Sequence, residues 1–278
     1  MKKYHISTKQ RNIYLNTVAI LIAAIFLFPL YWILINSFKI DSEVFRNPPT
    51  FWPEIFTLQA YTEQIGIMVR PFINSTVIAV SSMMISLTLA LPAAYGLARY
   101  SLPQSKFFLL TFLVTQMLPA SLVLTPLFLI FSGLGILNNY LSPIFATATV
   151  SIPFIVLLLR PNFLSVPREL EDSAKIDGCT PFGSFVRIII PATKPGIITA
   201  ACFAFVMAWN DLVYSMTFNT KEAMRPMTAG IYSFMNQYGT QWNKIMAYGI
   251  LLILPTCILF VTMQKYIVSG LVSGSVKG

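Results

Sequence analysis

The chain is 278 residues long, and 56% of its residues are hydrophobic while only 10% are charged, giving a mean hydropathy of +0.70. Apolar runs of about 20 residues, long enough to cross a bilayer as helices, recur along it and exclude an ordinary soluble protein. The net charge of +9 does not indicate a nucleic-acid-binding protein, because Lys and Arg lie at the ends of apolar runs and not on one face.

The apolar runs predict an all-α, polytopic membrane protein with one transmembrane domain over residues 1–278. The six expected spans cover about 13–36, 72–98, 107–131, 141–159, 197–217 and 246–268. The first run is too long for the apolar part of a signal peptide and no A-x-A site follows it, so we expect an uncleaved first span. Pro92, Pro119 and Pro126 interrupt the second and third spans, and Pro255 predicts a kink in the last.

The positive charges predict the orientation of the chain. If the N-terminus is cytoplasmic, 13 of the 19 Lys and Arg residues lie on the cytoplasmic side. The positive-inside rule therefore places both termini in the cytoplasm. The segments 37–71 and 218–245 then face outward.

The chain offers little for catalysis or metal binding. Cys179, Cys202 and Cys257 are far apart, and the only histidine is His5. We therefore expect no metal site, no disulfide framework and no catalytic set of side chains. No G-x-x-x-x-G-K-[ST] loop is present to cradle phosphates, so we expect no ATP hydrolysis and no cofactor on this chain.

A dense charged block, RELEDSAKIDG at 168–178, separates the fourth and fifth spans. Pro167 suits the first position of a helix, acidic residues follow in the first turns, and Gly178 suits the left-handed C-terminal position. Thr180 is then a plausible N-cap of a second helix that Pro191 ends. This second helix carries an apolar stripe at Phe182, Phe185, Val186 and Ile189.

These signals predict a helix–turn–helix within residues 161–195, too polar to insert in the membrane. An ordinary solvated loop needs neither two capped helices nor four acidic residues on the side where basic residues belong. An amphipathic helix pair on that side is typical of a docking element.

The block resembles the EAA loop of permease subunits of ABC importers, whose pattern is E-A-A-x3-G-x9-I-x-L-P. Here the pattern reads Asp172-Ser173-Ala174, three residues, Gly178, nine residues, then Ile188-Ile189-Ile190-Pro191. The spacing fits, while Asp172, Ser173 and Ile190 depart from the pattern. Other segments resemble the carbohydrate-uptake branch, in particular FPLYWILINSFK at 28–39, NPPTFWP at 47–53, PAAYGLARY at 92–100, TQMLP at 115–119, AWND at 208–211 and QKYIVSGLVSGSVKG at 264–278.

The resemblance implies a subunit of a sugar importer in a bacterial cytoplasmic (inner) membrane. Its partners would be a second, homologous permease subunit, two ATP-binding cytosolic subunits that hold ATP and Mg, and an external solute-binding protein. The EAA loop would couple to the ATPase through Glu169, Asp172, Ser173, Ala174, Gly178, Ile188 and Pro191. A C-terminal tail with Gly270, Gly274 and Lys277 would also contact the ATPase, and Tyr232, Tyr238 and Trp242 are candidate contacts for the binding protein.

Polar side chains within spans are candidates for the substrate path, because they are costly in a bilayer. They are Asn74, Gln116, Asn210 and Asp211. Asn74 and Gln116 equally suit hydrogen bonds between helices, and Asp211 equally suits a position at the outer interface.

Three other functions fit the sequence to different degrees. A polyol or glycerol-phosphate-type solute would suit the same kind of permease. An ion-coupled secondary transporter would need several buried acids or a broken-helix ion site, and only Asp211 lies in or near a span. An intramembrane enzyme lacks the catalytic groups.

Overall fold

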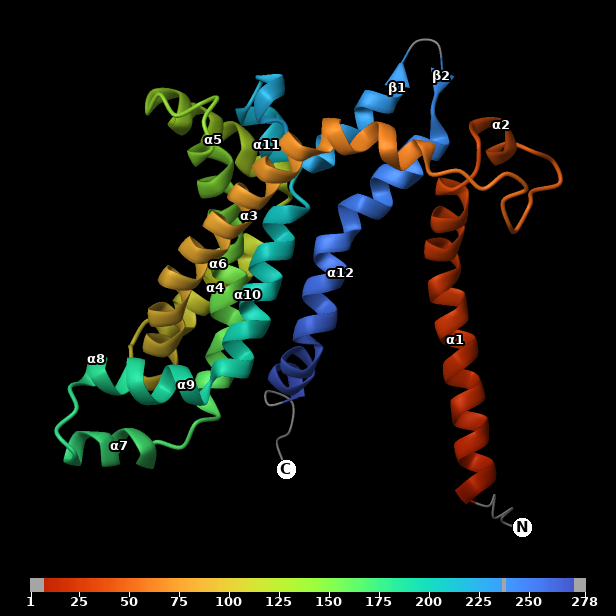
Figure 1. Ribbon diagram of the computed structural model, residues 1–278. Coiled ribbons are helices and arrows are strands. Elements are labelled where there is room, and N and C mark those ends of the chain that lie inside the picture. The colour runs from red at the N-terminus through yellow and green to blue at the C-terminus, as the bar shows by residue number, and fades with distance from the viewer. Residues whose placement is uncertain (1–7, 237–238, 273–278) are drawn as a thin grey trace. The chain divides into compact units, whose positions relative to one another are not determined.

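The structure is a computed structural model that describes residues 8–236 and 239–272, and it is built almost wholly of helices (Figure 1). The long helices are α1 (Thr8–Ser37), α3 (Gln59–Arg99), α6 (Leu141–Leu164) and α12 (Trp242–Val272). Shorter ones are α2 (Asp41–Val44), α4 (Ser105–Met117), α5 (Ala120–Gly133), α7 (Glu169–Ile176), α8 (Pro181–Ser184), α9 (Ile190–Ala192), α10 (Lys194–Trp209) and α11 (Val213–Phe218).

Less regular elements connect these helices. A π-helical segment, η1 (Phe185–Ile189), joins α8 to α9, and two 3-10 helices, η2 (Glu222–Met224) and η3 (Met227–Phe234), precede a short β-hairpin. Its strands β1 (Met235–Asn236) and β2 (Gly239–Thr240) are antiparallel, with Met235 opposite Thr240.

The all-α membrane architecture is confirmed, since four described helices are each long and apolar enough to cross a membrane. The number rises to six if each of two bent helix pairs forms one span. One pair is α4 and α5, bent by 101°, and the other is Pro181–Ala192 with Lys194–Trp209, bent by 81°.

Two of the expected spans are broken in the structure, whereas the other four lie within the longer helices α1, α3, α6 and α12. The segment 107–131 is not one helix, because Leu118 is extended and Pro119 starts α5 as its N-cap. An extended residue before proline relieves the clash with the proline ring. The segment 197–217 also breaks, since α10 ends at Trp209 and α11 begins at Val213.

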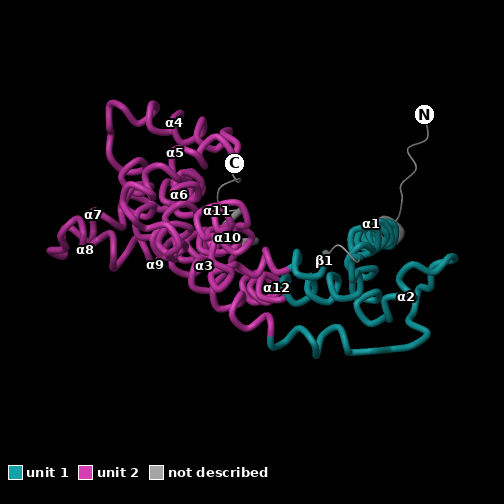
Figure 2. Tube along the Cα trace, turned by 90° about the horizontal axis from the view of Figure 1, so that it is seen from above, with its two compact units in different colours: residues 1–66, 231–253 teal, residues 67–230, 254–278 magenta. Residues whose placement is uncertain are grey.

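The chain divides into two compact units (Figure 2). Unit 1 comprises residues 1–66 and 231–253, and unit 2 comprises residues 67–230 and 254–278. The assignment of residues 1–278 to a single domain stays a prediction.

The core of unit 2 forms where α3, α6 and α10 pack together. Small residues line this contact, including Ala94 on α3 and Ala200 and Ala204 on α10, and they let Ile155 and Leu159 of α6 become fully buried. Small side chains bring helices close in a membrane, where dispersion contacts replace the hydrophobic driving force. Phe163, Phe185 and Ile189 extend the same core toward the segment that follows α6.

The helices α6 and α10 approach each other closely at Gly196. A Cβ atom at this position would lie 2.5 Å from Cγ of Asn162 on α6. The Asn162 side chain is buried and donates a hydrogen bond to the Leu158 carbonyl at 3.0 Å. The glycine is therefore required by the packing of the two helices.

Buried hydroxyl groups also join α3 to α6. Thr147 donates to Ser82 at 2.9 Å, and Ser86 and Ser151 are hydrogen bonded at 2.6 Å. Because each hydroxyl has a partner, none of the four leaves an unpaired polar group between these helices.

Candidate functional site

The α7–α9 hairpin, residues 169–192, is the charged block that the sequence singles out, and it lies at the opposite end of unit 2 from α5 and α11 (Figure 1). Its first helix, α7, has Glu169, Glu171 and Asp172 in the first turn and Lys175 in the last. Each charge is placed where the helix dipole stabilises it. The helix starts two residues later than Pro167 suggested, with Arg168 as its N-cap.

The turn of the hairpin depends on Gly178, whose φ of +80° is left-handed as predicted. The N–H of Cys179 donates to the Ala174 carbonyl at 2.9 Å, and the N–H of Gly178 donates to the Lys175 carbonyl at 3.1 Å. This pair of bonds is the Schellman motif, which satisfies the free carbonyls at the end of a helix.

The second half of the hairpin begins as the sequence predicts but does not stay a regular helix. Thr180 caps α8 and accepts a hydrogen bond from the Gly183 N–H at 3.1 Å. The chain then enters η1, where the N–H of Ile190 donates to the Phe185 carbonyl five residues back. Pro191 has no N–H to continue an α-helical ladder, which makes the wider turn less costly here.

The expected apolar stripe on this segment is only half buried. Phe185 and Ile189 join the core of unit 2, but Phe182 is 75% exposed and Val186 is also exposed. The helical segment ends at Ala192, one residue beyond Pro191.

The base of the hairpin is held to the end of α3 by a buried ion pair. Nε of Arg99 lies 2.6 Å from Oε1 of Glu171, and their side chains are only 6% and 12% exposed. The Nε–H bond is not aligned with this oxygen, so the contact is an ion pair and not a hydrogen bond. The aligned hydrogen bond to Glu171 comes from the Tyr95 hydroxyl, at 2.9 Å from Oε2.

Further contacts enclose this ion pair. Arg99 donates through Nη2 to the Val166 carbonyl at 2.8 Å. The Tyr95 ring lies 4.6 Å from the Phe185 ring and 5.9 Å from the Phe163 ring, measured between centroids. The end of α3, the end of α6 and both arms of the hairpin are therefore joined at one place.

Beside the ion pair is a cavity of about 280 Å³. Its lining comes from the end of α3, from both arms of the hairpin and from the residues next to them: Tyr95, Arg99, Tyr100, Arg168, Glu171, Asp172, Lys175, Pro181 and Ser184.

The outer surface of the hairpin is both charged and apolar. Ile176 is 87% exposed and stands next to the turn, as does the exposed Phe182. Asp172 is exposed and pairs with Lys175 at 2.9 Å, and this ammonium holds the pKa of the Asp172 carboxyl below its usual range. Of the other residues suggested by the EAA pattern, Glu169 and Ser173 are exposed, Ala174 is buried and Ile188 is partly buried.

Three of the four residues predicted to line the substrate path form hydrogen bonds with other parts of the chain. The Asn74 amide donates to the carbonyls of Ala223 and Arg225 and accepts from the Tyr140 hydroxyl. Gln116 donates to the Val150 carbonyl at 3.1 Å, which links α4 to α6. Such bonds are those expected of polar residues that join neighbouring segments.

Asp211 has a local structural role at the break between α10 and α11. Its carboxylate accepts hydrogen bonds from the N–H groups of Tyr214 and Ser215, at 3.1 and 2.8 Å, and from the Ser215 hydroxyl at 2.7 Å. It therefore caps α11 in the way that acidic residues cap helix N-termini. Asn210 is exposed at the end of α10. A role of these four residues in the substrate path stays a prediction.

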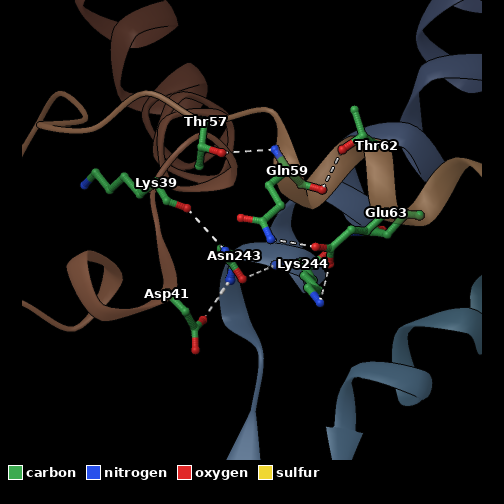
Figure 3. A network of polar contacts seen from close by, with 9 residues as sticks. Lys39, Asp41, Thr57, Gln59, Thr62, Glu63, Asn243 and Lys244 are labelled. Atoms are coloured by element: carbon green, nitrogen blue, oxygen red, sulfur yellow. Dashed lines mark hydrogen bonds and ion pairs between the residues drawn. The ribbon is translucent and has the colours of Figure 1, made fainter.

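A second polar cluster lies in unit 1 and joins three segments that are distant in sequence (Figure 3). Glu63 on α3 forms an ion pair with Lys244 at 2.6 Å and accepts from the Gln59 amide at 2.7 Å. Asn243 donates to the Lys39 carbonyl at 3.3 Å. The starts of α3 and α12 are thus tied to the segment after α1.

Two of the three candidate contacts for a binding protein are described by the structure, and both lie in unit 1. Tyr232 is 57% exposed, and Trp242 is 40% exposed with its ring 6.4 Å from that of Phe45. Tyr238 lies outside the described residues, as do Gly274 and Lys277 of the expected tail. Gly270 lies in the last turns of α12.

In residues 8–236 and 239–272, no group of three or more His, Cys, Asp or Glu side chains is placed to hold a metal ion. Cys179, Cys202 and Cys257 are not joined in disulfides.

Tyr95 and Arg99, which hold the hairpin, are not among the site residues predicted from the sequence. A signal was present, because the two are four residues apart at the charged end of a span and so share one helix face. What the sequence did not show is that Glu171 is their partner.

Comparisons with known proteins identify the family. The family model described as "Binding-protein-dependent transport system inner membrane component" matches residues 86–273. The sulfoquinovosyl glycerol transport system permease protein SmoH of Agrobacterium fabrum is 34% identical over 254 residues, which cover 91% of this chain and 89% of that protein. The diacetylchitobiose uptake system permease protein DasC of Streptomyces coelicolor is 30% identical over 265 residues, covering 95% and 96%.

A solved structure has the same fold. It is a bacterial ABC transporter involved in the import of the acidic polysaccharide alginate, with a TM-score of 0.78 and 20% sequence identity, covering 96% of this chain and 99% of that one. The family match extends over the end of α3 and the whole α7–α9 hairpin. The chain therefore belongs to the family of binding-protein-dependent transport system inner membrane components.

Proposed function

We propose that this chain is the membrane-spanning permease subunit of an ATP-driven importer for a sugar or an oligosaccharide. Family membership supports the transport function, and the names of the relatives SmoH and DasC, both permeases for glycosides, support the substrate class. Family membership also disfavours the ion-coupled alternative. The relatives leave the identity of the sugar open.

The observation that carries the proposal is the surface of the α7–α9 hairpin. A charged hairpin does not lie among lipid tails, yet its turn exposes Ile176 and Phe182. An apolar patch with a charged rim is typical of a protein–protein contact. We propose that this contact is made with cytosolic ATP-binding subunits, which hold ATP and Mg and hydrolyse the nucleotide.

The complete importer in this proposal contains a second, homologous permease subunit, two ATP-binding subunits and an external solute-binding protein. Both termini and the hairpin face the cytoplasm, in agreement with the distribution of Lys and Arg. Closure of the ATP-binding subunits moves the hairpin, and the helices joined to it change which side of the membrane the path opens to. This is alternating access, with no chemistry on the present chain.

The test is to purify the tagged chain from its native membranes and to reconstitute the recovered complex in liposomes. We expect ATP-binding subunits to co-purify, and sugars to enter only with ATP and the binding protein. Uptake driven by an ion gradient, with no ATP-binding subunit recovered, would contradict the proposal.

A further inference from the structure

Glu171 differs from the other acidic side chains of the α7–α9 hairpin. Glu169, Asp172 and Asp177 are exposed, whereas the Glu171 side chain is 12% exposed and faces α3. Both of its oxygens are engaged there, one with Arg99 at 2.6 Å and one with the Tyr95 hydroxyl at 2.9 Å. It is thus directed inward, while its acidic neighbours lie on the exposed surface of the hairpin.

An ion pair in this position is not explained by stability alone. Removing two charges from water is costly, and an apolar pair of similar volume is often as stable. A buried pair can instead select one geometry, because the charges and the hydrogen bonds around them fit in few arrangements. Here that geometry fixes α7 against the end of α3.

The contacts around the pair make the connection stiff. Arg99 also holds the Val166 carbonyl, just before the hairpin, and the Tyr95 ring packs on Phe185 in the second arm. Both arms are therefore fixed to the same turn of α3. A displacement of the hairpin has to move α3 or break the ion pair.

We infer that Glu171 is a positioning residue that transmits movement of the hairpin to α3 through Arg99 and Tyr95. The inference rests on the proposed function, since it requires an ATPase that moves the hairpin. Glu171 serves the connection inside the chain, while the exposed residues of the hairpin serve the contact with the partner.

The first test compares Glu171→Gln with Glu222→Gln in the reconstituted complex. Both changes remove one negative charge, but Glu171 contacts α3, whereas Glu222 lies outside the hairpin, is 85% exposed and pairs with Arg225. We expect Glu171→Gln to co-purify with normal amounts of the ATP-binding subunits and to import about tenfold less sugar per ATP hydrolysed, within the usual range for coupling between sites. Glu222→Gln should keep the wild-type ratio.

The second test uses the double variant Arg99→Gln, Glu171→Gln. It leaves no unpaired buried charge, so it should assemble even if Glu171→Gln does not. We expect its ratio of sugar to ATP to be as low as that of the single variant. A loss of assembly in the double variant would overturn the inference, because the pair would then be needed only for folding.

A wild-type ratio of sugar to ATP in either variant would also overturn the inference, and the proposed function would stand. The wild-type complex tests the proposed function separately. If it imports sugar without hydrolysing ATP, the proposed function itself fails.

Discussion

Gly178 shows how one residue determines the shape of the hairpin. Its φ of +80° lies in a region that L side chains rarely adopt, although no atom lies within 4 Å of a Cβ built there. A side chain at this position is therefore opposed by backbone strain and not by a clash. The strain amounts to about 1–2 kcal/mol for an ordinary residue and more for a β-branched one.

We predict that Gly178→Val abolishes most ATP-dependent uptake while the chain still inserts into the membrane. The substitution opens the turn and displaces the exposed residues on both of its sides. Uptake by reconstituted complexes, beside the amount of chain in the membrane fraction, measures the effect. Asn tolerates a left-handed backbone, so Gly178→Asn should retain much more activity. Equal activity in the Val and Asn variants would refute this explanation.

Gly196 is constrained for a different reason, the proximity of Asn162. We predict that Gly196→Ala lowers stability by about 1–3 kcal/mol, the usual effect of overpacking a closely packed core. Thermal unfolding in detergent should show a lower midpoint. The double variant Gly196→Ala, Asn162→Ala removes the clashing side chain and should recover part of the loss. A midpoint unchanged by Gly196→Ala alone would argue against so close an approach of α6 and α10.

Residue types at single positions correctly predicted two features of the hairpin. The N-cap at Thr180 and the left-handed glycine at 178 are confirmed, because each depends on the side chain or backbone of one residue and its immediate neighbours. The pair of Arg99 and Glu171 could not be derived in the same way. It joins two residues far apart in the chain, and the positions of charged residues in a sequence do not show which acidic residue will pair with which basic one.

At the scale of elements, hydropathy located the apolar segments but not their breaks. Pro92, Pro126 and Pro255 all lie inside continuous helices, whereas Pro119 coincides with the 101° bend. A proline in an apolar segment can therefore either lie within a continuous helix or mark a break between two helices. Which one occurs depends on whether neighbouring groups satisfy the carbonyls that proline leaves free, and this is a property of the packed structure.

The contact of α3 with α6 contains an element-scale prediction. Because Ser86 and Ser151 share a buried hydrogen bond, we expect Ser86→Ala to destabilise the chain by about 0.6 kcal/mol, the average for polar contacts between membrane helices. The loss should be smaller when Ser151→Ala is already present, since the partner is then gone.

A double-mutant cycle from unfolding in detergent measures this coupling. Thr88→Ala is the control, because Thr88 is exposed on the same helix and bonds only to the Met84 carbonyl of its own helix. Strict additivity of Ser86→Ala and Ser151→Ala would mean that the two hydroxyls do not interact.

At the scale of the whole molecule, the distribution of charge predicts orientation. Gln104, between α3 and α4, is exposed and belongs to a segment that we place in the cytoplasm. Thr220, after α11, is exposed and belongs to a segment that we place outside. Under the predicted orientation, these two positions report on opposite sides of the membrane.

We predict that Thr220→Cys reacts with a membrane-impermeant thiol reagent in cells whose outer barrier has been opened, and that Gln104→Cys reacts only after the cytoplasmic membrane is permeabilised. Both are made in a chain with Cys179, Cys202 and Cys257 replaced by Ala. The opposite labelling pattern would reverse the orientation derived from the positive-inside rule.

The exposed turn of the α7–α9 hairpin also bears on how the chain is made in the cell. A subunit that has not met its partners leaves Ile176 and Phe182 in water, where apolar groups favour aggregation and recognition by chaperones and proteases. Under the proposed function, the amount of this chain that survives synthesis follows the supply of its ATP-binding partners. The feature that joins the complex thereby also limits the lifetime of any excess copies.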